Sequence, residues 1–236
     1  MKFKKLACLA FAMTAAGVVQ AEGEQQWGGA YVGANAGLSS FQTETADYWC
    51  WYACDAPGNV KQGSTFGLNI GYNFQLDDNF VVGVEADHNS GQDANEGIAW
   101  SNGNDGVLWN NELDNEQTLR VRVGLAVDNT LVYVTGGLAR ADVTHEALEF
   151  EAGGTNLDRA MFDGTARGLV SGIGVEHQFM DNVSFRMEYV TTQYEKESAC
   201  WADNAGCDLN PGEGDDQVHW TDNTSSIRAG VNWIFF

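Results

Sequence analysis

The chain has 236 residues, with 33 Asp+Glu against 12 Lys+Arg and a formal net charge of −21. This acidity excludes a nucleic-acid-binding protein, because nucleic-acid phosphates would be repelled. A hydrophobic content of 44% excludes wholesale disorder. With 28 Gly, 11% aromatic residues and only 2 Pro, the composition favours many strands over helices.

The first 21 residues have the pattern of a secretory signal peptide. Three lysines within the first five residues precede an apolar stretch from Leu6 to Val19, and Val19-Gln20-Ala21 is a small-x-small cleavage site. A buried N-terminal helix is the alternative. After this segment no run of about 18 apolar residues follows, which excludes a helical membrane protein. We expect residues 1–21 to be removed on export and residues 22–236 to form one domain, with 9 Lys+Arg, 33 Asp+Glu and a net charge of −24.

Four cysteines remain after cleavage, in two close pairs: Cys50 with Cys54, and Cys200 with Cys207. We expect disulfides, because an exported protein meets an oxidising compartment. Each pair would close a short local loop, although four cysteines allow three connectivities. A zinc site of four thiolates is the alternative, but the compartment and the absence of a histidine beside either pair weigh against it.

Apolar residues recur with a period of two along most of the mature chain, which is the pattern of half-buried strands. Leu119, Val121 and Val123, for example, alternate with Arg120 and Arg122. The facing of the segment 130–140 is ambiguous. The segments with this pattern, eight in all, are about 30–38, 66–74, 80–87, 119–127, 130–140, 169–179, 183–189 and 227–235.

Short and long connections alternate strictly between these segments. The three short connections, at 76–79, 128–129 and 180–182, contain Asp and Asn, which tolerate tight turns. The four long ones are polar. A soluble sandwich has no reason to keep every long loop at one end, whereas a transmembrane barrel has periplasmic turns and outer loops. The long connections are expected at about 39–63, 88–116, 142–165 and 195–223.

Each predicted strand has one apolar face and one face of Gly, Asn and charged residues. If the apolar face turns to lipid and the polar face turns to a lumen, each face meets surroundings of its own polarity. The sequence therefore predicts an all-β, eight-stranded antiparallel up-and-down barrel that spans a membrane. A soluble, lipocalin-type barrel is the alternative. Eight strands enclose a space only just wide enough for side chains. We therefore predict a salt-bridged plug of four acidic and four basic residues in the lumen: Glu85, Asp87, Glu176, Glu188, Arg120, Arg122, Arg186 and Arg228.

Both ends of the mature chain carry a family resemblance. The segment Trp27 to Gly37, WGGAYVGANAG, resembles the opening strand of small outer-membrane β-barrel proteins of the opacity-protein type, and the transmembrane domain of outer membrane protein A is similar in size. The ending from Ile227 to Phe236 is similar to that family's closing strand. The resemblance implies a bacterial outer-membrane location with both termini in the periplasm. It also implies that Trp233, Phe235 and Phe236 form the signal for the barrel-assembly machinery, although Phe236 is one residue more than the usual spacing.

The sequence gives no pattern typical of catalysis. A hydrolase of the kind that modifies lipid A needs a serine activated by a histidine that an acid orients. The histidines, His88, His145, His177 and His219, show no such constellation, and no phosphate loop or zinc-protease motif is present. Acidic clusters such as 203–216 could bind divalent cations, but they lack a full calcium-loop pattern. We expect no enzyme, cofactor or metal.

A structural or surface-interaction role, such as adhesion or contact with a host or the environment, fits the predicted loops best. Tryptophans amid dense Asp, Glu, Asn and Gly could mark a binding surface or form an interfacial girdle; they are Trp49, Trp51, Trp100, Trp109, Trp201 and Trp220. A small pore is the alternative function, which the predicted plug disfavours. The expected partners are outer-membrane lipid, lipopolysaccharide and an unknown extracellular ligand, and the expected state is a monomer.

Overall fold

The computed structural model describes residues 26–47, 56–77, 79–90, 93–100, 106–150, 156–201 and 217–235. The predicted signal peptide lies outside these residues. No helix in the described part has the length and apolar character to cross a bilayer. The described residues form strands β1 (Gly29–Asp47), β2 (Ala56–Gln75), β3 (Phe80–Ser90), β4 (Asp93–Trp100), β5 (Gly106–Val127), β6 (Thr130–Phe150), β7 (Asn156–Met180), β8 (Val183–Tyr194), β9 (Glu197–Cys200) and β10 (Gln217–Phe235).

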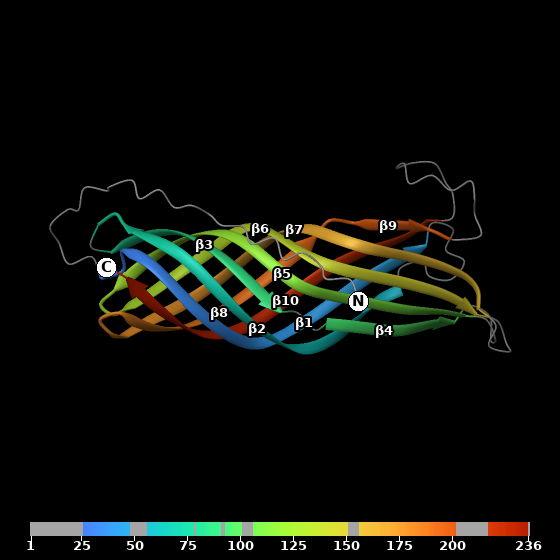
Figure 1. Ribbon diagram of the computed structural model, residues 1–236, viewed down its shortest axis with the longest axis horizontal. Coiled ribbons are helices and arrows are strands. Elements are labelled where there is room, and N and C mark those ends of the chain that lie inside the picture. Colours follow the sequence, from blue (N-terminus) through green and yellow to red (C-terminus); the bar gives the residue numbers. More distant parts are fainter. Residues whose placement is uncertain are drawn as a thin grey trace, which may run out of the picture.

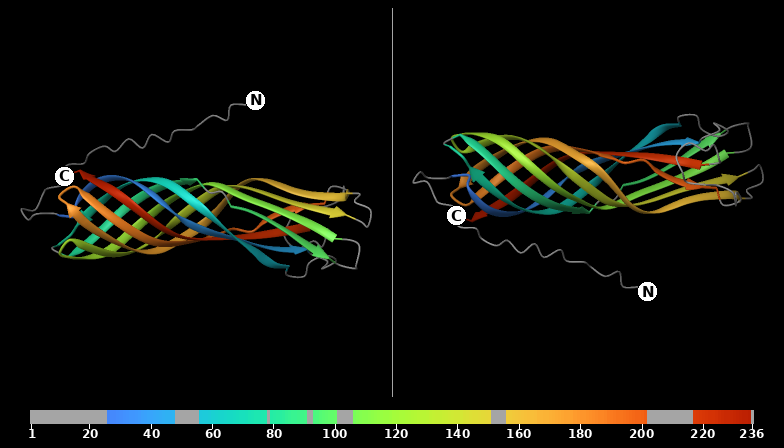
Figure 2. Two further views of the ribbon diagram at one scale, coloured as in Figure 1. Left: turned by 90° about the horizontal axis from the view of Figure 1, so that it is seen from below. Right: turned by 90° about the horizontal axis from the view of Figure 1, so that it is seen from above.

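Eight of the strands close into a ring in the order β1-β2-β3-β5-β6-β7-β8-β10, and every neighbouring pair is antiparallel. The pairing of β1 with β10 closes the ring, from Ala30 opposite Phe235 to Asp47 opposite Val218. The barrel is elongated, and its strands are tilted against its long axis (Figures 1 and 2). This confirms the predicted eight-stranded antiparallel barrel.

The strands run much further than the sequence pattern indicates. β4 pairs with the first part of β5, and β9 pairs with the first part of β10, both at the end of the barrel away from the short turns (Figure 1). We call this end the extension; it comprises β4, β9 and the parts of the ring strands that lie beyond the residues predicted as strand. The prediction of long loops was therefore wrong over much of their length, because the following parts are strand: 39–47, 56–63, 88–90, 93–100, 106–116, 142–150, 156–165, 197–200 and 217–223.

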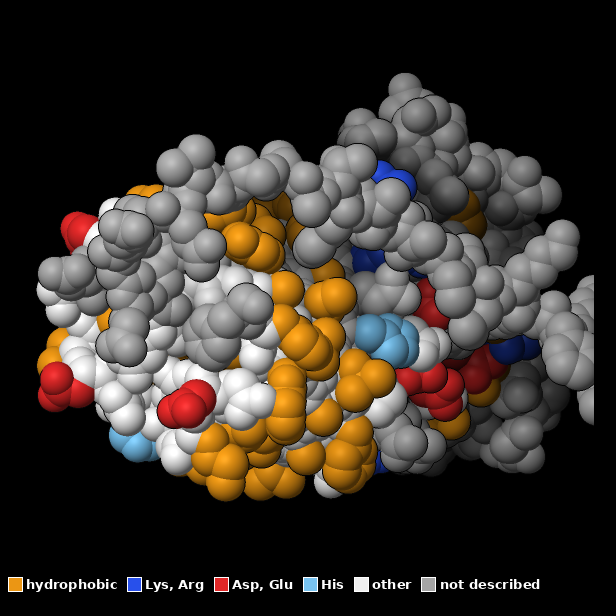
Figure 3. Space-filling model, turned by 60° about the vertical axis from the view of Figure 1, so that its left-hand side comes forward, with side chains coloured by type: hydrophobic (Ala, Val, Ile, Leu, Met, Phe, Trp, Pro, Cys, Tyr) orange, Lys and Arg blue, Asp and Glu red, His pale blue; other side chains and the backbone are white. Residues whose placement is uncertain are grey.

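Large apolar side chains cover the outside of the barrel near the short turns. They form a belt across the face in Figure 3, with acidic side chains beyond it. Many are more than half exposed, among them Leu119, Leu125, Leu169 and Ile227. The facing of 130–140 is now clear, since Val132, Val134 and Leu138 point outward while Leu131, Tyr133 and Thr135 are buried inside.

The interior is filled in layers along the barrel axis. At the turn end, Trp27, Val81, Ala126, Leu131 and Tyr133 form an apolar cluster. Charged residues follow, and two more apolar clusters fill the lumen towards and within the extension. The first contains Phe41, Leu113, Ala139, Ala141, Val143, Ala166, Val170, Val190 and Tyr194, and the second Val107, Trp109, Ala147, Ala160, Ala199, Trp201, Val218 and Trp220.

Two glycines make room for the tyrosines of the lumen. A Cβ on Gly71 would lie 2.3 Å from ring atoms of Tyr31, and one on Gly174 would lie 2.4 Å from Cζ of Tyr133. Both distances are far shorter than any van der Waals contact, so each tyrosine lies flat over a strand that must lack a side chain there. The glycines on the polar strand faces thus allow a narrow barrel to hold large side chains.

Candidate functional site

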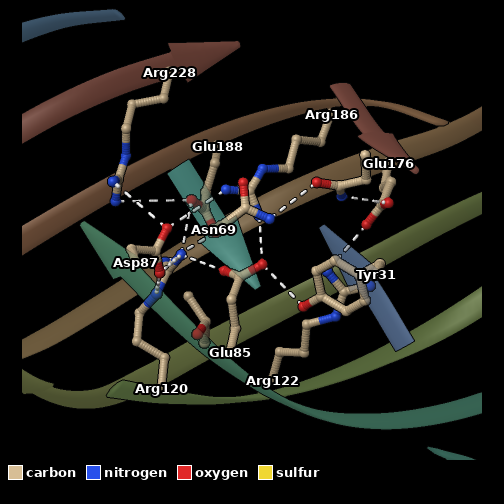
Figure 4. Close-up of polar contacts among 12 residues, drawn as sticks. Tyr31, Asn69, Glu85, Asp87, Arg120, Arg122, Glu176, Arg186, Glu188 and Arg228 are labelled. Atoms are coloured by element: carbon tan, nitrogen blue, oxygen red, sulfur yellow. Dashed lines mark hydrogen bonds and ion pairs between the residues drawn. The ribbon is translucent and has the colours of Figure 1, made fainter. Parts of the chain in front are cut away.

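The eight charged residues predicted for the lumen all lie inside the barrel and are almost fully buried, with exposures of 1–5%. They come from β3, β5, β7, β8 and β10 and point toward one another (Figure 4). Tyr31 of β1 and Tyr133 of β6 join them through hydrogen bonds and ring contacts. Asn69 of β2 donates to the side-chain oxygen of Asn232 of β10 at 3.0 Å, and Asn232 in turn donates to Glu176 at 2.8 Å. We call these twelve residues the lumen network, and every strand of the ring contributes to it.

Arg120 lies at the centre of the lumen network. Its guanidinium contacts Glu85 at 2.5 Å, Asp87 at 2.9 Å and Glu188 at 2.9 Å, so one cation faces three carboxylates. Thr118 also donates to Asp87 at 3.0 Å. Charge-assisted hydrogen bonds of this kind are the strongest a protein makes, and here they lie away from bulk water.

Two further arginines balance the carboxylates around Arg120. Arg186 contacts Glu85 at 2.6 Å and Asp87 at 3.5 Å. Arg228 lies further away, 4.0 Å from Asp87 and 3.8 Å from Glu188. The three arginines and three carboxylates thus form one contiguous cluster without net charge.

The fourth arginine is held differently. Arg122 lies between the rings of Tyr31 and Tyr133, with its guanidinium carbon 5.0 and 4.8 Å from the two ring centroids, and it contacts Glu176 at 3.0 Å. The tyrosine hydroxyls donate to the neighbouring carboxylates, Tyr31 to Glu85 at 2.9 Å and Tyr133 to Glu188 at 3.2 Å. These contacts combine cation–π attraction with hydrogen bonding and join Arg122 to the rest of the network.

A second polar site lies in the extension. The His145 side chain is fully buried, with Nδ1 2.9 Å from the Asn111 side-chain oxygen and Nε2 3.0 Å from a carboxylate oxygen of Asp222. Its ring stacks on Trp220 with centroids 5.2 Å apart and an interplanar angle of 9°. The imidazole is therefore fixed by partners at both nitrogens and by an aromatic face. The sequence pattern missed this site because it assigned these residues to loops.

A serine and a histidine lie together at the rim of the extension. Ser198 Oγ and His219 Nδ1 are 2.7 Å apart across the β9–β10 pair. Burial lowers the pKa of His219 from its ordinary value of 6.5, and the nearby Lys196 lowers it further. A neutral imidazole beside a hydroxyl is the first half of a hydrolytic triad. Among the described residues, however, no carboxylate is hydrogen-bonded to His219.

The remaining predicted site residues are placed only in part. Trp233 and Phe235 lie on the outer face of β10 and are half exposed, while Phe236 lies outside the described residues. Cys200 ends β9 and is disulfide-bonded. Cys50, Cys54 and Cys207 lie outside the described residues, so the pairing stays a prediction. Within the described part no group of three or more acidic, His or Cys residues could hold a metal ion.

The tryptophans expected in exposed loops are placed differently where the structure describes them. Trp109, Trp201 and Trp220 are at most 7% exposed and pack inside the extension. They are neither a binding surface nor an interfacial girdle, because their rings form the apolar filling of the lumen there. The side chains of Trp49, Trp51 and Trp100 lie outside the described part.

Comparisons with known proteins agree with this architecture. A family model described as "Outer membrane protein beta-barrel domain" matches residues 6–235. The chain is 27% identical over 219 residues to the 31 kDa outer-membrane immunogenic protein of Brucella melitensis, covering 89% of this chain and 84% of the relative. It is 25% identical over 221 residues to the 25 kDa outer-membrane immunogenic protein of Brucella canis, covering 92% and 83%. The solved structure of the outer membrane protease OmpT from Escherichia coli is similar with a TM-score of 0.51 and 10% identity, covering 87% of this chain and 97% of that chain. At such identity the likeness shows the fold alone.

Proposed function

The chain belongs to the outer membrane protein beta-barrel domain family, and from this premise we propose that it is a non-catalytic barrel with a closed lumen and a structural or surface-contact role. The short turns and both chain ends face the periplasm, and the extension projects from the cell. The partners at the surface are lipid, lipopolysaccharide and an extracellular ligand.

The observation that carries this proposal is the lumen network. Every strand of the ring contributes a side chain to it, so its contacts cross the lumen from all sides (Figure 4). An eight-stranded barrel leaves little space beyond its own side chains. Apolar clusters fill the lumen on both sides of the network. A hydrated ion would have to displace buried ion pairs and then cross an apolar layer.

The proposed orientation places most of the acidity outside the cell. The four carboxylates of the lumen network are matched by four arginines, so the net charge of −24 expected for the mature chain arises elsewhere. Exposed acids of the extension include Glu112, Asp114, Asp142 and Asp163. Such a surface repels polyanions and attracts cations. The relatives are named as immunogenic proteins, which is in keeping with a displayed surface.

Conductance in planar bilayers tests the closed lumen. We expect the folded full chain to give no stable, large conductance. The double variant Arg120→Ala/Glu85→Ala removes side-chain volume and one charge of each sign from the network and should conduct measurably if it folds. The matched control Arg159→Ala/Glu146→Ala removes a partly exposed ion pair from the extension and should stay closed. Stable large conductance of the unmodified protein would refute the closed lumen and favour a pore.

Orientation and catalysis need separate measurements. A membrane-impermeant maleimide should label Asp163→Cys on intact cells and leave Asp128→Cys, in a short turn, unlabelled; the reverse result would invert the orientation.

For catalysis, the Ser198–His219 pair is the group to test. Esterase activity, or a mass shift of lipid A on overexpression, that Ser198→Ala abolishes would overturn the non-catalytic assignment.

A further inference from the structure

Two arginines face each other on the outside of the barrel at the edge of the apolar belt. Arg140 of β6 and Arg167 of β7 are opposite residues in the strand register, and both side chains are exposed. Opposite residues on one face of a sheet have Cβ atoms only about 5 Å apart, and like charges there are unfavourable. An anion bound between the two guanidinium groups would relieve this repulsion.

The acidic residues nearest to the two arginines in the described part do not form ion pairs with them. No described residue forms an ion pair with Arg140 or Arg167, although Asp142 is two positions further along β6. The Asp142 carboxylate accepts hydrogen bonds from Asn115 at 3.2 Å and from Thr165 at 3.5 Å. Glu195 lies beside Arg167 through a backbone hydrogen bond of 2.7 Å, yet their side chains make no ion pair.

The surroundings of the pair favour a lipid over a free anion. Leu138 and Leu169 are the register pair two positions nearer the membrane on the same face, and they are 62% and 67% exposed. A ligand that satisfies both pairs has an anionic group above and apolar chains below. Guanidinium groups bind phosphate oxygens in a bidentate geometry, which makes phosphate the best match for the anionic group.

We propose that Arg140 and Arg167 form a binding site for the phosphate of a phosphorylated glycolipid headgroup in the outer leaflet, with Leu138 and Leu169 against its acyl chains. The choice of leaflet rests on the orientation proposed above, which the maleimide experiment tests independently. The site lies on the outer wall of β6 and β7 and is separate from the lumen network.

Lipid binding to the full folded chain in detergent, counted by native mass spectrometry, tests this site. The probes are diphosphorylated lipid A and the same lipid with both phosphates removed. Two basic residues near an anionic surface account for an affinity factor of about thirty, so we expect the phosphorylated lipid to bind about thirty-fold more tightly. Arg140→Gln/Arg167→Gln should abolish this preference, and each single variant should lose about fivefold.

The controls separate a specific site from general attraction. Arg140→Lys/Arg167→Lys retains the charge and should keep most of the preference. Arg159→Gln removes the same charge from β7 eight residues further from the belt and should keep all of it. A shift in gel mobility on boiling verifies that each variant is folded.

Three results would overturn the site: equal binding of the two lipids, an unchanged preference in the double Gln variant, or an equal loss in Arg159→Gln. Displacement of lipid A by micromolar inorganic phosphate would identify a free-anion site instead.

Discussion

The two ends of strand β5 have opposite polarity. Near the short turns, its inward residues include Arg120 and Arg122, and its outward residues are apolar. In the extension, its inward residues are mostly apolar and include Val107, Trp109 and Leu113, and its outward residues include exposed acids. One strand therefore passes from a segment built for lipid outside and polar groups inside to a segment built for water outside and an apolar interior. The solvent around each part decides which face is apolar.

A β-bulge produces this reversal within β5. Apolar residues occupy odd positions in both parts, but between Asp114 and Gln117 strand β5 advances three residues while its partner β6 advances two. The extra residue turns the odd positions from the outside to the inside. Asn115 in the bulge has a φ of 54°, and the Asp114 carboxylate accepts its backbone N–H at 2.8 Å. The bulge thus lets residues at odd positions face the lumen in the extension and lipid in the part near the short turns.

The largest effect is expected for a change in the lumen network. Arg120→Ala should destabilise the barrel by about 3–5 kcal/mol, because removing one partner of a buried ion pair leaves unpaired charges. Here three carboxylates lose their shared partner. Urea unfolding in lipid vesicles measures the free energy of unfolding of each variant. The control Arg159→Ala breaks an ion pair whose arginine is 51% exposed and should cost less than about 1 kcal/mol. Similar costs for both variants would contradict the buried network.

A substitution in the apolar interior of the extension should lower the free energy of unfolding by a similar amount, but the effect should be confined to the extension. Trp220→Ala removes a fully buried ring that stacks on His145, at a cost of about 3–5 kcal/mol. We expect limited proteolysis to cut the extension faster while the gel shift on boiling persists, because the membrane part keeps its own contacts. Loss of the gel shift would show that the two parts fold as one unit.

The ring and its lumen charges were predictable from the sequence because a period of two is a local signal. Where both faces are apolar, as at Leu131 and Val132, that signal cannot assign the facing, and only the packing of Leu131 against the turn-end cluster decides it. In the sequence, the alternation of the opening strand places Tyr31 on the polar face, together with Gly33 and Asn35. Its role between Gly71 and Arg122 depends on neighbours far away in the sequence.

The extension was missed because acidic residues and asparagines obscure its alternation. Trp109 and Leu113 lie at alternate positions, but Asn110 to Glu112 between them read as a polar loop. The burial of His145 and Asp222 together depends on the strands of the ring continuing beyond the belt. Alternate apolar residues within an acidic segment that directly precedes or follows a lipid-facing strand are the signal that could have revealed it.

The outer face should tolerate charge differently in the two parts. Met187 and Gln193 both point outward from β8, but only Met187 lies within the apolar belt. Met187→Arg should cost about 2–4 kcal/mol, and Gln193→Arg about 0–1 kcal/mol, because the penalty falls from the bilayer midplane to its edge. Unfolding in vesicles measures both. Equal penalties would place the membrane boundary elsewhere.

The bulge should be sensitive to the backbone conformation at Asn115. Asn115→Val places a β-branched residue at a φ of 54° and should cost about 1–2 kcal/mol, whereas Asn115→Gly should be nearly neutral. Proteolysis of the extension, compared between the two variants, measures the effect. If valine is tolerated as well as glycine, backbone strain does not hold the bulge, and the reversal of faces has another cause.

The smallest effect concerns the water-facing rim of the extension. Because burial and Lys196 lower the pKa of His219, the folded state binds this proton less readily than the unfolded state. The associated stability is present above about pH 6.5 and is lost as the pH falls below it. Histidine NMR should give a midpoint below 6.5 that rises with Lys196→Gln and is unchanged by Lys61→Gln. A midpoint at or above 6.5 would mean that this rim is as open to water as the exposed faces around it.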